Sequence, residues 1–583
     1  MNLAHFPGRA WQTGTSGISE NGKQVLEARY LKKDELGTVV ESPDEMFWRV
    51  ARTVAAADAA YDGGDAESAA QIFFDMMHRL EFLPNSPTLM NAGRDFQQLS
   101  ACFVLPVEDA LDAIFETVKN MALIHKSGGG TGFSFSHIRP RGDRVRSTQG
   151  VASGPVSFMR VFDAATDAVK QGGMRRGANM GVLRVDHPDI LEFIDSKSSR
   201  TELQNFNISV AITDAFMEAA KAGVDYALIH PRTGAPRGHL NAREVLGRIC
   251  RRAWEGGDPG LLFLDTINRA NPTPALGAIE CTNPCGEQPL LPFEACNLGS
   301  INLARMALTQ GGRIVVNYPH LARTVHSAVH FLDNVIDANE YPLPQIGAVT
   351  RGNRKIGLGV MGWADLLMKL GIPYGSAQAL TLADRLMGFI RRVGHRASAE
   401  LARKRGTFPN SPRWAAPMRN ATVTTVAPTG SLSIIAGCSS GIEPLYALSF
   451  SRSNILAGQE LEEVHRGLLE DLSRRGLTTP AILEKISKTG SAGTIEELPS
   501  ELRARYATAL EIGPQWHVRT QAAFQAHSDN AVSKTVNLPF QATIGDVEEI
   551  FNLAFGLGCK GITVYRDRCR DAQVLSAGCT ACA

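Results

Sequence analysis

The sequence lacks any stretch that predicts a membrane span, and it has no charge excess that predicts an anionic partner. No apolar run reaches the roughly 18 residues needed to cross a bilayer. The first eleven residues lack the long apolar core of a secretory signal. Lysines and arginines number 60 against 59 acidic residues, so the formal net charge is +1. No global field therefore recruits nucleic acid or a membrane, and a phosphate group must be held by local contacts.

Cysteine is also scarce, with ten in 583 residues. This density is far below that of disulfide-stabilised secreted domains, which favours a reducing, cytoplasmic location. In that compartment, cysteines that lie near one another indicate redox or metal chemistry more often than structural disulfides.

The chain is too long for one ordinary core and has the composition of a globular protein, 44% hydrophobic and 20% charged. Residues 1–85 predict a helical region, with a helix start at Ser42 and Pro43. Beyond it, strand patterns alternate with long helical ones, which favours an α/β architecture. We expect strands at 99–105, 207–212, 421–426 and 561–565, and helices at 108–126, 241–256, 318–339, 360–370, 378–405 and 545–556, with 456–505 helical between polar breaks.

Three glycine-containing stretches are candidates for ligand contact. Residues 127–132 follow a helix rather than a strand, so a helix C-cap and tight turn explains them as well as a ligand does. Residues 171–179 place two arginines among glycines, as in an anion-contacting loop or an ordinary exposed turn. Residues 427–434 follow a strand and could offer backbone N–H groups and hydroxyls to a phosphate. A capped helix start without a ligand is the alternative there.

The densest group of reactive side chains lies at residues 283–289 (NPCGEQP). Asn283, Cys285 and Glu287 alternate along it, and alternate side chains of an extended segment point the same way. The prolines disfavour a helix or a regular strand. We therefore expect a stiff loop that presents all three side chains to one molecule. A proline-rich turn around a structural cysteine is the alternative.

A second cysteine pattern ends the sequence, where Cys579 and Cys582 form a CxxC pair on a polar tail. A mobile dithiol that reduces an interior disulfide is one interpretation. A four-thiolate zinc site with Cys559 and Cys569 is another, and an incidental pair is a third. A shuttle needs an interior disulfide, and Cys102 and Cys296 are among the cysteines available, although sequence alone cannot pair them.

Four motifs together resemble the catalytic chain of ribonucleotide reductase, specifically its adenosylcobalamin-dependent class II branch. They are the 283–287 stretch, residues 100–104 (SACFV), residues 427–431 (APTGS) and the terminal CxxC, and the likeness runs from about residue 80 to the end. The resemblance implies a ten-stranded α/β barrel of two five-stranded halves over residues 86–565. A finger loop near 281–290 would enter its centre, and residues 566–583 would form a redox-active tail.

The resemblance also implies roles for these residues. Cys285 would be the transient thiyl radical that removes the 3′ hydrogen of the ribose. Glu287 would be the general base, and Asn283 would orient the substrate. Cys102 and Cys296 would deliver two electrons and become a disulfide. Cys579 and Cys582 would reduce that disulfide, and a thioredoxin-like donor would restore the tail.

The same likeness assigns binding positions. Substrate would contact Ser86, Ala101, Gly130, Asn283, Gly286, Ala427, Pro428, Thr429, Gly430 and Ser431. A deoxynucleoside triphosphate effector would contact Asp109, Arg139 and Arg175, with residues 172–179 relaying its identity to the substrate base. The effector site would lie at a homodimer interface formed by helices such as 108–126. A diphosphate substrate is expected because the chain resembles the dimeric, effector-regulated branch.

The radical source follows from two absences. Class I enzymes pass the radical through adjacent tyrosines, and this sequence has no Tyr-Tyr pair. Class III enzymes use a C-terminal glycyl radical, and no such motif is present. Both absences favour adenosylcobalamin, with no other metal than its cobalt. A class I-type subunit that needs a metal-radical partner, and a zinc-stabilised nucleotide-binding regulator, are the competing hypotheses.

Overall fold

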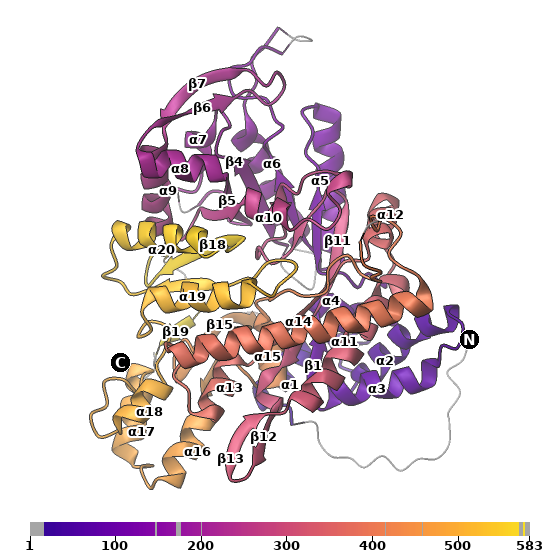
Figure 1. Cartoon of the computed structure of the whole chain (residues 1–583), viewed down its shortest axis with the longest axis vertical. Helices are drawn as coiled ribbons and strands as arrows, with labels where there is room; N and C mark the ends of the chain where they lie inside the picture. Colours follow the sequence, from indigo (N-terminus) through magenta and orange to yellow (C-terminus); the bar gives the residue numbers. More distant parts are fainter. Residues whose placement is uncertain are drawn as a thin grey trace.

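The structure is a computed structural model that describes residues 17–145, 149–170, 177–199, 201–413, 415–456, 459–570 and 575–577. Helices α1 (Glu20–Arg29), α2 (Pro43–Ala55) and α3 (Ala66–His78) pack beside a barrel, as Figure 1 shows. Within these described ranges, no helix combines the length and apolarity needed to cross a membrane.

Helix α2 forms as its sequence predicts. The Ser42 hydroxyl accepts a hydrogen bond from the Glu45 backbone N–H, and the Glu45 carboxylate accepts one from the Ser42 backbone N–H, a capping box. Pro43 occupies the first turn, where a missing N–H costs nothing. Phe47, Val50 and Val54 are fully buried, so one apolar stripe fixes α2 against its neighbours.

The first half of the barrel is a sheet of five parallel strands. In spatial order they are β2 (Cys102–Leu105), β3 (Gly130–Ser134), β4 (Asn179–Arg184), β5 (Phe206–Ile212) and β8 (Gly260–Phe263). The helices between them are α5 (Leu111–Lys126), α6 (Pro155–Lys170), α7 (Ile190–Asp195), α8 (Asp214–Ala222) and α9 (Ala242–Gly256), with a hairpin of β6 (Asp225–Ile229) and β7 (Pro236–Asn241).

The second half is built in the same way around β11 (Glu294–Asn302) and β14 (Ile356–Met361), which are parallel. Parallel bridges join Leu358 to Thr424 and Val426 to Val532. The series ends with the parallel pair β17 (Thr535–Leu538) and β18 (Gly561–Arg566). Residues 422–426 therefore take the place of the middle strand.

The halves join antiparallel at both edges, β11 against β2 and β18 against β8. This closes the sheet into a ring, and the predicted ten-stranded α/β barrel of two halves is confirmed. Strand β1 (Phe82–Pro84), which follows the N-terminal helices, pairs antiparallel with β11. The barrel interior holds an apolar cluster that includes Cys102, Val182, Leu262, Cys296 and Leu298.

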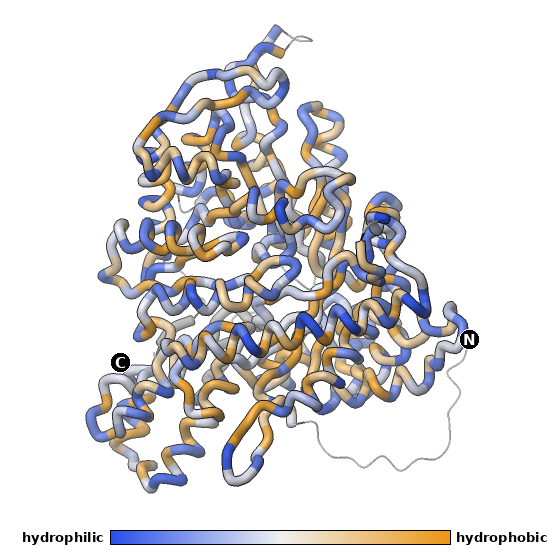
Figure 2. Tube along the Cα trace, in the orientation of Figure 1, coloured by the Kyte–Doolittle hydropathy of each residue, from blue (hydrophilic) through white to orange (hydrophobic). Residues whose placement is uncertain are grey.

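Helices cover the second half from outside. The long helix α14 (Ala377–Arg405) crosses the front of the molecule and alternates hydrophilic and hydrophobic residues in Figure 2. It packs on α11 (Tyr318–Ala338) and α19 (Pro514–Gln525). The other helices are α4 (Ser86–Asn91), α10 (Leu264–Arg269), α12 (Pro344–Asn353), α13 (Trp363–Leu370), α15 (Gly430–Ala436), α16 (Arg466–Arg474), α17 (Pro480–Thr489), α18 (Ser500–Arg505) and α20 (Ile544–Gly556).

Four expectations about secondary structure were wrong. Residues 130–132 open strand β3 instead of completing a turn, and residues 360–361 belong to β14, so the next helix begins at Trp363. Residues 421–426 make two isolated bridges instead of a regular strand. The region predicted as helical from 456 begins with a hairpin of β15 (Ser449–Leu456) and β16 (Gln459–Val464). Glycine-rich strands and short bridges carry little periodic signal, which explains these errors.

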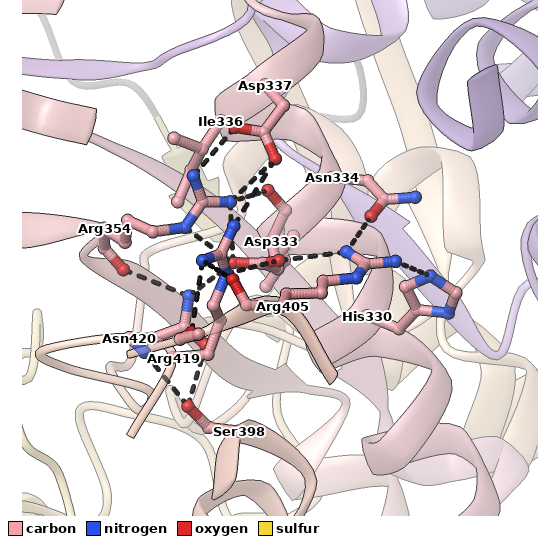
Figure 3. Close-up of polar contacts among 12 residues, drawn as sticks. His330, Asp333, Asn334, Ile336, Asp337, Arg354, Ser398, Arg405, Arg419 and Asn420 are labelled. Carbon is pink, nitrogen blue, oxygen red and sulfur yellow. Dashed lines mark hydrogen bonds and ion pairs between the residues drawn. The ribbon is translucent and has the colours of Figure 1, made fainter. Parts of the chain in front are cut away.

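A buried charge cluster ties the helical region to the barrel (Figure 3). Asp333 on α11 is fully buried and accepts hydrogen bonds from Arg354 at 2.9 and 3.0 Å and from Arg405 at 3.0 Å. Arg354 also donates to Asp337 at 2.7 Å, and Arg419 lies 3.4 Å from Asp333. These partners satisfy one another in a place where an unpaired charge would be costly.

The N-terminal helices join this cluster through Asp58 and Tyr61. Asp58 pairs with Arg405 and with His330, the latter at 2.8 Å. The Tyr61 hydroxyl donates to Asp337 at 2.7 Å and accepts from Arg419 at 2.6 Å. The helical region is therefore fixed to the second half of the barrel by charged contacts as well as by its apolar core.

Candidate active site

The predicted finger loop is a hairpin. Strands β9 (Cys281–Thr282) and β10 (Pro289–Leu290) pair antiparallel, and the Gly286 N–H closes a turn by donating to the Asn283 carbonyl at 3.0 Å. Gly286 has φ of 82°, a conformation that favours glycine. The extended conformation that we expected for 283–287 is therefore wrong, whereas the stiff loop is observed.

The loop lies inside the barrel and contacts both halves. Asn207 on β5 donates to the Pro284 carbonyl at 2.8 Å, and Ala531 and Thr425 donate to the Glu287 carbonyl at 2.9 and 3.0 Å. The loop fits inside the barrel because a glycine on the neighbouring strand has no side chain in its way. A Cβ on Gly132 would lie 1.8 Å from the Thr282 carbonyl oxygen, so this strand position admits no larger residue.

Two of the three predicted loop side chains contact Cys102. Asn283 and Glu287 are both 3% exposed. The Asn283 amide donates to Cys102 Sγ at 3.2 Å, and the Cys102 thiol lies 3.9 Å from Glu287 Oε1. Asn283 is itself fixed, because its Oδ1 accepts from the Gln288 N–H at 3.0 Å. An amide, a carboxylate and a thiol therefore meet in a nearly water-free place.

Cys102 and Cys296 face each other across the junction of the two halves. They are Cα partners in the antiparallel pairing of β2 with β11. Directly opposed residues bring their Cβ atoms to about 4.5–5.5 Å, near the range of a disulfide. Burial, reinforced by the charge of Glu294, raises the pKa of the Cys296 thiol well above its ordinary value. The sequence alone could not pair these two cysteines, and the fold places them side by side.

Cys285 differs from these cysteines because it is exposed. It lies on the wall of a cavity of about 460 Å³. Polar and apolar side chains line this cavity together, among them Asn207, Tyr446, Gln521, Lys534, Ile562 and Tyr565. The sequence did not indicate that these residues share a cavity, since they come from separate segments spread between Asn207 and Tyr565. The one signal in the sequence that could have indicated a cavity-lining residue was the polar Asn207 at the start of a predicted strand.

The predicted substrate residues divide between the barrel interior and its rim. Gly130 pairs with Cys102 on the neighbouring strand, and its N–H donates to the Ala101 carbonyl at 2.8 Å. Ala427 belongs to the apolar cluster of the interior. Ser86 follows β1 at the start of α4, where its hydroxyl contacts the Tyr30 hydroxyl at 2.8 Å.

The loop at 427–431 has one strained residue. Thr429 has φ of 53°, and its hydroxyl accepts from the Gly441 N–H at 2.7 Å. Pro428 lines the cavity with Cys285, and α15 begins at Gly430 with Ser431 in its first turn. The loop is thus held rigidly beside the finger loop.

The predicted effector residues are only partly described. Arg139 Nε donates a bifurcated hydrogen bond to Asp109, at 2.9 and 3.0 Å from the two carboxylate oxygens. Asp109 stands just before α5, and Arg139 follows β3. Arg175 lies outside the described residues. Effector contact at Asp109, Arg139 and Arg175 stays a prediction.

The terminal cysteines Cys579 and Cys582 also lie outside the described residues. Just before them, β19 (Leu575–Ala577) pairs antiparallel with β15. Cys559 and Cys569 are buried. The described ranges contain no group of three or more His, Cys, Asp or Glu side chains arranged for a metal. The shuttle and zinc interpretations of the tail therefore both stay untested.

Comparison with known proteins gives the family. The family model described as "Ribonucleotide reductase, all-alpha domain" matches residues 16–97, and "Ribonucleotide reductase, barrel domain" matches 100–413 and 414–565. The division at residue 85 was set from sequence alone and stays a prediction.

Two relatives named "Vitamin B12-dependent ribonucleoside-diphosphate reductase" are similar over most of their length. The one from Thermoplasma acidophilum is 48% identical, over 96% of this chain and 80% of the relative. The one from Mycobacterium tuberculosis is 52% identical, over 95% and 80%. The solved alpha subunit of the class Id ribonucleotide reductase of Actinobacillus ureae shares the fold, with a TM-score of 0.76 and 24% identity over 94% of this chain and 97% of that one. The chain belongs to the ribonucleotide reductase family.

Proposed function

We propose that this chain reduces ribonucleoside diphosphates to 2′-deoxyribonucleotides, with adenosylcobalamin as the source of the radical. The names of the relatives that are about half identical support both the reaction and the cofactor. The observation that carries the proposal is the arrangement of three cysteines around one carboxylate. Cys285 faces a cavity, whereas Cys102 and Cys296 lie paired and buried behind the same loop, next to Glu287.

Each side chain suits its assigned task. As a thiyl radical, Cys285 would take the 3′ hydrogen, while Glu287 accepts the 3′-hydroxyl proton as general base. Cys102 and Cys296 would supply two electrons and two protons as the 2′-hydroxyl leaves as water, and a disulfide would join them. Asn283 is already held toward this place by the Gln288 N–H. The barrel wall around the cavity would keep water from the radical once substrate and cofactor are bound.

The cavity beside Cys285 fits the face of a large cofactor. Gln521 lines it, and its buried Oε1 has no hydrogen-bond partner among the described residues, so it can accept from a bound group. Asn207, Tyr446 and Tyr565 add further polar atoms to a partly apolar wall. Adenosylcobalamin, when bound, supplies the initial radical through its weak cobalt–carbon bond. The residues around Cys285 would exclude water and hold the thiol toward that face.

Substrate would lie between the finger loop and the 427–431 loop. The N–H groups at the start of α15 can donate hydrogen bonds to a phosphate without any excess of positive charge. Ala101 and Gly130, beside Cys102, would face the ribose, while Ser86 would approach from α4. Gly286 would leave room for the sugar at the tip of the finger loop.

We further propose that the chain works as a homodimer in the cytoplasm, controlled by a deoxynucleoside triphosphate. Leu111 and Phe115, one turn apart on α5, are 63% and 51% exposed. Exposed apolar side chains at that spacing favour contact with a second copy. Asp109 and Arg139 adjoin this face, where an effector would reach both subunits. A thioredoxin-like protein would restore the tail cysteines Cys579 and Cys582.

The test is an anaerobic assay of the purified chain with adenosylcobalamin, dithiothreitol and an effector, on CDP and CTP in parallel. We expect deoxycytidine diphosphate as the main product. No product from either substrate would overturn the proposal. Activity that appears only after a metal-radical partner protein is added would support the class I-type alternative. Preference for CTP would mean that the substrates are triphosphates instead of diphosphates, and the proposed reduction reaction would still hold.

A further inference from the structure

One row of side chains crosses three strands inside the barrel: Cys102, Cys296 and Lys355. Cys102 and Cys296 are partners on β2 and β11. The register of β11 with β14 pairs Asn297 with Ile356, so Lys355 stands beside Cys296. The contact of Cys296 Sγ with the Lys355 carbonyl at 3.5 Å agrees with this. Registered neighbours in a sheet present their side chains to the same face, which places the Lys355 side chain beside Cys296, with Cys102 on the far side of β11.

A buried ion pair holds Lys355 in this row. Its Nζ lies 2.8 Å from Glu294 Oε2, and the two side chains are 1% and 0% exposed. Glu294 shares the face of Cys296, two residues away on the same strand, and it also accepts from Asn353 at 2.6 Å and from the Leu291 N–H at 2.8 Å. Among the described residues, Glu294 is the one acceptor of Lys355 Nζ. The ammonium therefore keeps N–H groups for another anion.

Fold stability alone does not explain such a pair. An apolar pair of similar volume is often as stable as a buried ion pair, or more so. The neighbouring thiol offers a reason. Burial and Glu294 both raise the pKa of Cys296, and the charge of Lys355 opposes them. A thiolate at Cys296 is thus costly, and Lys355 is placed to reduce that cost.

We propose that Lys355 stabilises the Cys296 thiolate that leaves when the Cys102–Cys296 disulfide is reduced. The inference deepens the proposed function and rests on it, because that reaction leaves this disulfide after every turnover. Cys102 is the sulfur under attack, since it is 3% exposed beside the finger loop whereas Cys296 has no exposed surface. The dithiol on the tail, or dithiothreitol in its place, is the reductant.

The step balances in atoms and electrons. A thiolate of the dithiol attacks Cys102 Sγ, the Cys102–Cys296 bond breaks, and its electron pair goes to Cys296 Sγ. Lys355 donates a proton to that sulfur and regains one from the second thiol of the dithiol. That second thiolate displaces Cys102, which takes up the proton released when the first thiol ionised. One dithiol becomes one disulfide, and two protein thiols are restored.

The decisive variant is the double change Glu294→Gln with Lys355→Met, which removes the cation without leaving a buried carboxylate unpaired. The full chain is oxidised with diamide, and recovery of the Cys102 and Cys296 thiols by dithiothreitol is followed by alkylation and peptide mass analysis. We expect reduction about tenfold slower than in the parent, since exchange slows as the pKa of the leaving thiol rises. Lys355→Arg, which keeps the charge, should recover most of the rate.

Two controls separate this role from a structural one. Lys197→Gln removes another largely buried lysine, whose Nζ lies 2.7 Å from Asp258, and it should reduce at the parent rate, with Asp258 still paired to Arg570. In the double variant, the product formed in one turnover without added reductant should equal that of the parent. Parent-rate reduction in the double variant would overturn the proposal, as would equal slowing in Lys197→Gln.

The outcomes also distinguish this proposal from the proposed function. If the parent chain makes no deoxynucleotide, the proposed function fails. The diamide-formed disulfide then still reports whether Lys355 speeds its reduction. If the parent is active and the double variant reduces normally, the role of Lys355 alone is wrong.

Discussion

Two buried groups of polar side chains in this chain differ in the kind of contacts that their members make. At the domain junction, three arginines meet three aspartates, and Asp333 alone accepts from Arg354 and Arg405 within 3.0 Å. In the barrel interior, Glu287 Oε1 meets a thiol at 3.9 Å, a far weaker partner than a guanidinium.

The difference indicates that the charge cluster stabilises the fold and that the barrel-interior group carries out the reaction. Mutually saturated charges fix one arrangement and leave nothing for a ligand, so the junction cluster holds the helical region on the barrel. A carboxylate and thiols grouped around a cavity-lining cysteine can instead exchange protons or hydrogen atoms with a substrate. The two groups should therefore respond oppositely to substitution, one in stability and the other in turnover.

The strongest test of the comparison is Cys285→Ser. We expect product formation to fall to background, because a hydroxyl does not form the required radical under these conditions. The free energy of unfolding should hardly change, since Cys285 is exposed and its loop is held by backbone contacts. Anaerobic product assays and urea unfolding measure the two quantities. Retained turnover would contradict the assigned role of Cys285.

Glu287→Gln should cause the second-largest loss of turnover. The amide keeps the shape of the carboxylate but cannot act as a base, so turnover should fall by about 10²–10⁴-fold. The thermal midpoint should stay close to that of the parent. A variant that loses stability and keeps its turnover per folded molecule would place Glu287 with the junction cluster instead.

Asp333→Ala tests the other side of the comparison. Arg354, Arg405 and Arg419 would lose a shared partner in a dry place, and breaking a buried pair costs about 3–5 kcal/mol of unfolding free energy. Turnover per folded molecule should be unchanged. Urea unfolding gives the first quantity and an assay at low temperature the second. The matched control is Glu484→Ala, which removes an exposed pair with Lys488 and should leave stability as it was.

Local patterns predicted an α/β architecture and a stiff loop at 283–289, whereas the ten-stranded barrel was expected from the family resemblance. The finger loop is marked by prolines and by Cys285 within a few residues, and α2 by its cap and its apolar stripe. These features depend on neighbours in the chain, so they can be recognised without the fold.

The missed features depend on contacts between distant segments. Strands β3 and β14 contain Gly132 and Gly357, which weaken any strand pattern, and the structure shows that the finger loop requires these glycines. A Cβ at Gly357 would lie 2.7 Å from Gln288 Nε2. Likewise, Glu294 and Lys355 are 61 residues apart and become partners only when β11 and β14 align.

The smallest expected effect is a change in how stability depends on pH, and it concerns the aspartates of the charge cluster. Burial by itself raises the pKa values of Asp58 and Asp337, but His330 beside Asp58 and Arg354 beside Asp337 outweigh it, and both pKa values are lowered. The unfolded chain therefore binds more protons in acid. Stability contributed by these pairs is complete above the ordinary carboxyl range, near pH 4, and is lost as the pH falls through the lowered pKa values.

Asp337→Asn should remove part of this acid sensitivity. The variant should be less stable than the parent at pH 7 and should lose less stability between pH 5 and pH 3, by an amount on the order of 1 kcal/mol. Urea midpoints measured across that range test the difference. Parallel curves for Asp337→Asn would mean that the junction aspartate contributes no proton-linked stability, and the contrast between the two groups would then rest on substitution effects alone.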